Sequence, residues 1–187
     1  MQTPLENVVA NNTRITGFAA AHIAHFAPPP LYTGSAKPGR HHAAYESVVL
    51  PRQQKSGNGL CDVDVPSYAS APASGNLSAF GGMIVDHARK TATPLDYLIT
   101  GPATNLAALL REYGGALREA LGTVTMMGGK FGPLWQQIPG ADFNIACDPF
   151  AVDTLLGAGL NLRFVPMNAT WPLALSLPEI ESLRPQN

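Results

Sequence analysis

The stretch Leu121–Pro149, LGTVTMMGGKFGPLWQQIPGADFNIACDP, decides the fold of this chain. It opens with Leu121–Met127, a short run of apolar and β-branched residues that ends at a glycine pair. Such a run predicts a buried strand of a parallel sheet. At the other end, Asp148 followed by Pro149 predicts a cap and the first residue of a helix that continues over Phe150–Leu156. The stretch therefore predicts a strand, a glycine turn, a polar loop and a helix.

Two polar residues of this loop, Asp142 and Asn144, are candidates for contact with a ligand. In open α/β sheets ligands bind in the crevice outside the carboxyl ends of the strands, which is where the loop begins. With an extended backbone across residues 141–144, the carboxylate and the amide would point the same way and Phe143 would point into the protein. The pattern predicts a pair that reads hydroxyl groups. The alternative is that Asp142 only caps backbone amides.

Strands and helices alternate along the rest of the chain. A helical stripe of apolar residues runs from Leu77 to Ala88, and Leu95–Thr100 has the composition of a strand. A helix is expected from Thr104 or Asn105 to Leu110, and another strand over Leu162–Pro166. The alternation predicts an α/β fold with a mostly parallel, Rossmann-like open sheet, helices on both faces and right-handed crossovers.

Composition and charge narrow the class of partner. Of 187 residues, 45% are hydrophobic and 13% are charged, and the formal net charge is −1. These values argue against disorder and against nucleic-acid binding, and favour a small neutral ligand. Cys61 and Cys147 are too few for a disulfide framework, so a reducing, cytoplasmic setting is expected. Without a long apolar run, no membrane association is expected either.

Four motifs occur in an order that resembles one known family. They are ITGPATNLAALL at 99–110, MMGG at 126–129, ADFNIACDP at 141–149 and VPMNATWP at 165–172. The inosine/uridine-preferring nucleoside hydrolases carry similar strings, close to GPLTNLA, MGG, AEFN-x-x-xDP and VPLDVT. The resemblance covers nearly the whole chain, and it implies hydrolysis of the N-glycosidic bond of ribonucleosides.

The resemblance also implies a ligand set. Asn11 would contact the ribose, Asp142 and Asn144 would read its hydroxyls, and Met127 would line the pocket. A calcium ion would bind the ribose diol and the attacking water, and the main-chain carbonyl of Thr104 would be one of its ligands. Asp142 stands where the family usually has glutamate, so its carboxylate lies about 1.5 Å further back.

Two family segments are missing from residues 1–187: the N-terminal DTDxGxDD motif and a later His-Asp segment. We therefore expect a single nucleoside hydrolase-like domain that is incomplete at both ends, and no catalytic residue is assigned. Expressed alone, it is expected to show no calcium-dependent hydrolysis. An exposed strand edge would also allow copies of the chain to pair as a homo-oligomer.

Three functions remain in view. The first is a nucleoside hydrolase in truncated form. The second is a non-catalytic nucleoside-binding, ribose-binding or structural relative that has lost the metal site. An unrelated nucleotide-binding module is disfavoured, because the chain has no phosphate-binding fingerprint.

Overall fold

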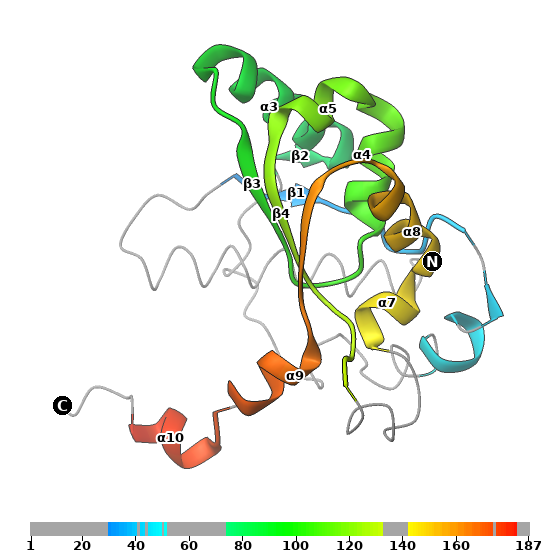
Figure 1. Ribbon diagram of the computed structural model, residues 1–187, viewed down its shortest axis with the longest axis vertical. Coiled ribbons are helices and arrows are strands. Elements are labelled where there is room, and N and C mark those ends of the chain that lie inside the picture. The colour runs from blue at the N-terminus through cyan, green and yellow to red at the C-terminus, as the bar shows by residue number, and fades with distance from the viewer. Residues whose placement is uncertain are drawn as a thin grey trace.

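The structure is a computed structural model that describes residues 30–40, 42–43, 45–49, 51, 74–132, 142–173 and 175–182. Its main sheet has three parallel strands in the order β3 (Leu95–Ile99), β4 (Leu121–Met127) and β5 (Asn161–Val165). A separate parallel pair is formed by β1 (Tyr32–Thr33) and β2 (Gly75–Asn76). The predicted α/β architecture with parallel strands is confirmed (Figure 1).

The central strand is the one that the opening stretch predicts. In β4, Val124 pairs with Tyr97 of β3 on one side and with Leu162 of β5 on the other. Val124 and Met126 are fully buried. Because β4 has a neighbour on each side, its carboxyl end lies in the middle of the sheet edge where the three strands end.

Helices connect and cover these strands. The described helices are α3 (Leu77–Thr91), α4 (Thr104–Tyr113), α5 (Gly115–Ala120), α7 (Phe143–Cys147), α8 (Pro149–Gly157), α9 (Met167–Thr170) and α10 (Leu177–Ser182), with a π-helix, η1, at Tyr45–Val49 and a 3-10 turn, η3, at Trp171–Leu173. Figure 1 shows α9 and α10 leading away from the end of β5. The predicted helices that become α3, α4 and α8 are confirmed.

Local capping signals explain where several helices begin. The side chain of Asn76 accepts from the backbone amide of Ala79 at 2.9 Å and caps α3. Asp148 caps α8, and Pro149 is the first residue of that helix, as predicted. Glu179 accepts from the backbone amide of Ser176 at 2.7 Å, which is half of a capping box before α10. Each of these bonds joins residues three positions apart, and of the three the sequence analysis predicted the cap at Asp148.

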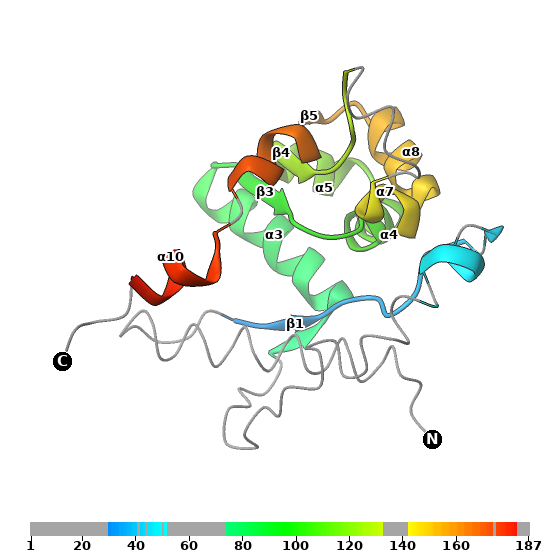
Figure 2. The same cartoon turned by 90° about the horizontal axis from the view of Figure 1, so that it is seen from below.

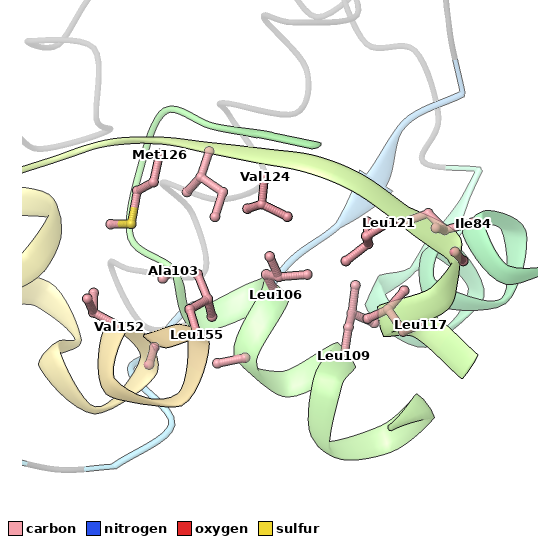
Figure 3. Packing of buried hydrophobic residues seen from close by; sticks show 14 of the residues in the cluster. Ile84, Ala103, Leu106, Leu109, Leu117, Leu121, Val124, Met126, Val152 and Leu155 are labelled. Atoms are coloured by element: carbon pink, nitrogen blue, oxygen red, sulfur yellow. The ribbon is translucent and has the colours of Figure 1, made fainter. Parts of the chain in front are cut away.

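One hydrophobic core joins four helices to the sheet. Buried side chains of α3, α4, α5 and α8 meet those of β3 and β4, and Figure 3 shows Leu106, Leu109 and Leu155 below Val124 and Met126. In Figure 2, α3 lies between β1 and the main sheet. Phe80 of α3 accordingly has ring contacts on both sides, 5.1 Å from Tyr32 and 6.0 Å from Tyr97 between centroids.

The opposite face of the sheet has a different composition. Leu98, Thr125 and Arg163 form one row across the three strands. Leu98 is 68% exposed and Arg163 is also exposed, so no described helix covers this row. Within the described ranges, the core helices therefore pack on one face of β3-β4-β5, whereas the sequence predicted helices on both faces. The polar Thr125 and Arg163 leave little apolar surface there for a helix to cover.

Three segments differ from the sequence-based expectations. Residues 143–147 form α7, although an extended backbone was expected over 141–144, and residues 167–170 form α9, although no helix was predicted directly after Pro166. The short helix α5 between Gly114 and β4 was not predicted at all. All three helices are only four to six residues long, so they span too few turns to show an apolar period. None of the helices in the described ranges has the length and apolar composition needed to cross a membrane.

The packing of α3 against α4 gives a stability prediction. A Cβ atom at Gly81 would lie 2.5 Å from Tyr113 Cε2 and 2.7 Å from Leu109 Cδ2. Gly81→Ala should therefore lower the free energy of unfolding by about 1–2 kcal/mol, because overpacking outweighs the gain in helix propensity. Urea denaturation measures the change.

Gly82→Ala is the matched control in the same helix. A Cβ atom there would have its nearest contact at 3.4 Å, with the Tyr113 hydroxyl. This variant should keep or raise the free energy of unfolding, by up to about 1 kcal/mol. Equal stability changes in the two variants would contradict the close helix contact at Gly81.

Candidate functional site

The ends of β3 and β4 are joined by the side chain of Asn144. Its amide nitrogen Nδ2 donates to the Met127 carbonyl at 3.1 Å and lies 3.3 Å from the Thr100 carbonyl and 3.2 Å from the Met127 sulfur. Carbonyl oxygens can only accept hydrogen bonds, so this contact fixes which end of the amide is the nitrogen. The carbonyl Oδ1 is consequently directed away from the two strand ends. Asn144 thus presents Oδ1, a hydrogen-bond acceptor, on the side that faces away from these strand ends.

Asp142 lies beside the same strand end. Its side chain is 4% exposed, and its Oδ1 accepts from the backbone amide of Ile145 at 3.2 Å, which makes it the cap of α7. A Cβ atom at Gly128 would be 3.5 Å from this oxygen. The structure therefore brings Asp142 and Asn144 to the end of β4, as the sequence predicted.

The predicted local geometry of this pair is wrong. The expected extended backbone would have turned Phe143 inward, but Phe143 is the first residue of α7 and is 37% exposed. The physical reason is the capping bond from Asp142, which satisfies a free amide of the first turn and starts a helix directly after it. Asp142 thus has the capping role that was the alternative interpretation, at a position beside Gly128 after the end of β4.

Met127 and Thr104 are placed by main-chain and side-chain contacts. The Met127 carbonyl and sulfur accept from Asn144, so Met127 helps to orient that amide. Thr104 is the first residue of α4 and is 8% exposed, and its hydroxyl donates to Asp148 Oδ2 at 2.8 Å. The metal-ligand role of the Thr104 carbonyl and the pocket-lining role of Met127 stay predictions. Asn11 lies outside the described residues.

Sequence reasoning missed a second group of contacts at the ends of β4 and β5. The backbone amide of Met167 donates to the Gly129 carbonyl at 2.9 Å. The Asn168 side chain accepts from the Phe131 amide at 2.9 Å and donates to the carbonyl of the same residue. These bonds hold the loop after β4 against α9. Only the VPMNAT motif at the end of a strand could have indicated them.

The site contains a cysteine whose thiol is not reactive at neutral pH. Burial, together with the smaller effect of the nearby carboxylates of Asp142 and Asp148, raises the pKa of Cys147 from 9.0 to about 11. Cys147 is 4% exposed. A buried thiol with this pKa is almost entirely protonated at pH 7, so it is not a nucleophile for this site.

The calcium ion that the resemblance implies can be tested against the described residues. Calcium takes about six to eight oxygen ligands. Within the described ranges, no group of three or more histidine, cysteine, aspartate or glutamate side chains comes together that could hold a metal ion. The described residues do not by themselves fit the ion.

Comparison with known proteins gives a consistent result. A family model described as inosine-uridine preferring nucleoside hydrolase matches residues 2–187. The pyrimidine-specific ribonucleoside hydrolase RihA of Salmonella paratyphi A is 26% identical over 155 residues, which are 83% of this chain and 47% of that protein. The chain spans about half the length of the curated relatives it matches.

Solved structures are similar over most of the chain. A purine-preferring ribonucleoside hydrolase from Gardnerella vaginalis is 26% identical with a TM-score of 0.68, over 94% of this chain and 52% of that one. An inosine-uridine preferring nucleoside hydrolase from Bacillus anthracis is 18% identical with a TM-score of 0.55, over 95% of this chain and 57% of that one. The second similarity concerns the fold alone.

Proposed function

Because the chain belongs to the inosine-uridine preferring nucleoside hydrolase family, we propose that the protein hydrolyses the N-glycosidic bond of ribonucleosides. The products are the free base and ribose. The observation that carries the proposal is the Asn144 amide, which is fixed by two strand ends beside the buried carboxylate of Asp142. A rigid acceptor beside a carboxylate suits the hydroxyls of a ribose.

The chemistry requires such rigid groups. Cleavage of the bond passes through an oxocarbenium-like state, in which positive charge develops on the ribose ring. A preorganised acceptor and a carboxylate stabilise that charge and orient the sugar without reorganising during the reaction. Asn144 Oδ1 would accept from one hydroxyl, and Asp142 would add negative charge next to it. Asn11 is proposed to contact the same ribose.

The proposal covers purine and pyrimidine ribonucleosides. The Salmonella relative is named as pyrimidine-specific and the Gardnerella relative as purine-preferring, at the same identity to this chain. Base choice therefore does not follow from the resemblance. Calcium remains a proposed cofactor, to which the described residues would contribute the Thr104 carbonyl.

The test is release of free base by the protein expressed from its complete reading frame. Inosine and uridine are incubated with it in the presence of calcium, and the base is quantified by chromatography. We expect release from at least one of the two and much slower release from the matching 2′-deoxynucleoside, which lacks one hydroxyl. Binding of nucleoside without any release would support the non-catalytic alternative. The absence of both binding and release would refute the proposal.

A further inference from the structure

The carboxylate of Asp148 contacts three separate parts of the chain. It is 1% exposed. Its Oδ1 accepts from the backbone amide of Ala151 at 3.0 Å, which caps α8. Its Oδ2 accepts from the Thr104 hydroxyl at 2.8 Å and from the backbone amide of Gly39 at 2.9 Å. A helix cap needs only the first of these bonds, so Oδ2 has a different role.

Gly39 is the last residue of a segment, residues 34–39, and a second contact holds the other end of this segment. The side-chain oxygen of Asn105 accepts from the backbone amide of Ser35 at 2.8 Å. Gly34 lies so close to this amide that a Cβ atom would be 2.5 Å from Asn105 Nδ2. The backbone of residues 34–39 is therefore bound at both ends to α4 and the start of α8.

This segment lies next to the elements of the proposed ribose site. Beyond it, the His42 ring nitrogen Nε2 is 3.2 Å from the carbonyl of Cys147, at the end of the helix that carries Asn144. On the other side, the carbonyl of Thr100 faces the Asn144 amide, and Thr104 is only four residues further along the chain. Displacement of residues 34–39 would thus disturb both sides of the site.

We propose that Asp148, with Thr104 and Asn105, is a positioning residue that anchors residues 34–39 beside the nucleoside site. Burying a carboxylate oxygen costs free energy unless hydrogen-bond donors satisfy it, so the folded chain is favoured when both donors lie next to Oδ2. Those donors come from positions 44 and 109 residues away in the chain. The anchor itself is independent of the proposed function, whereas its effect on catalysis rests on that function.

Asp148→Asn separates anchoring from capping. Asparagine caps helices as well as aspartate does, so its oxygen can keep the bond to Ala151. Its NH2 group then faces the Gly39 amide. Both groups are donors, so the hydrogen bond to Gly39 is lost. Amide hydrogen exchange measured by NMR should be about 10-fold or more faster at Gly39 and unchanged at Ala151. Unchanged exchange at Gly39 would overturn the anchor, whatever the activity.

A second variant keeps the test informative if Asp148→Asn does not fold. Thr104→Val removes only the hydroxyl donor, and Thr104→Ser retains it. Gly39 exchange should rise in the valine variant and return to the wild-type rate in the serine variant. Asn76→Ala, which removes the α3 cap, is the control for general loss of stability and should leave Gly39 unchanged. A rise with Asn76→Ala equal to that with Thr104→Val would also overturn the anchor.

Kinetics test the link to the site. Asp148→Asn should raise KM for the ribonucleoside that the protein cleaves more than it lowers kcat, because the released segment must be ordered again when substrate binds. Asn76→Ala should leave both constants unchanged. Faster Gly39 exchange with unchanged KM would overturn the link to the nucleoside site. A wild-type protein without activity would refute the proposed function, while Gly39 exchange would still decide the anchor.

Discussion

Replacing Asn144 with alanine should lower kcat/KM for ribonucleoside hydrolysis by about 100-fold or more. The substitution removes the acceptor Oδ1 that is proposed to read a ribose hydroxyl. It also removes the donor that lies between the carbonyls of Thr100 and Met127. Steady-state kinetics with the preferred ribonucleoside measure the loss.

Two further variants sharpen this prediction. Asn144→Asp should be at least as impaired, because a carboxylate oxygen would face two carbonyl oxygens and repel them. Asn161→Ala is the matched control, since Asn161 donates to the Thr123 hydroxyl at 3.2 Å, at the start of β5 and thus at the opposite end of the strands. Asn161→Ala should have near wild-type kinetics. Near wild-type activity of Asn144→Ala would refute the position of the ribose site.

Replacing Leu109 with alanine should lower the free energy of unfolding by about 2–5 kcal/mol. Leu109 lies in α4, is 0% exposed and belongs to the core cluster beneath the sheet (Figure 3). Truncation removes buried apolar surface and leaves a cavity between α3 and α4. Because domains are stable by only about 5–15 kcal/mol, the variant should unfold at much lower urea concentration.

The control for this variant is a leucine in another helix. Leu156 of α8 is 62% exposed, so Leu156→Ala should change the free energy of unfolding by less than about 0.5 kcal/mol. A similarly small effect of Leu109→Ala would show that the core between α3, α4 and β4 is not packed as described.

The parts of the fold that the sequence alone predicts are those with short-range signals. The apolar run of β4, the stripe of α3 and the cap formed by Asp148 and Pro149 each depend on residues within a few positions of one another. The position of Asp142 and Asn144 at the end of β4 was also predictable. A polar loop directly after a parallel strand must begin at the crevice.

The orientation of the site residues depended on contacts that the sequence does not show. Whether residues 143–147 are extended or helical is decided by the bond from Asp142 to the Ile145 amide, and both conformations suit such a short segment. The direction of the Asn144 amide is decided by two carbonyls that are 17 and 44 residues away.

The clearest contrast is Asp148, because one of its oxygens follows a local rule and the other does not. Its Oδ1 caps α8 three residues later, and the Asp-Pro pair alone predicts this bond. Its Oδ2 binds Thr104 and Gly39, which approach it only when the chain has folded. Capping is a property of neighbouring residues, whereas the anchor arises from where β3, β4 and the segment after β1 end in space. The sequence therefore determined the longer elements and the edge of the sheet that carries the site, and the tertiary structure decided the short helices and which polar atoms meet there.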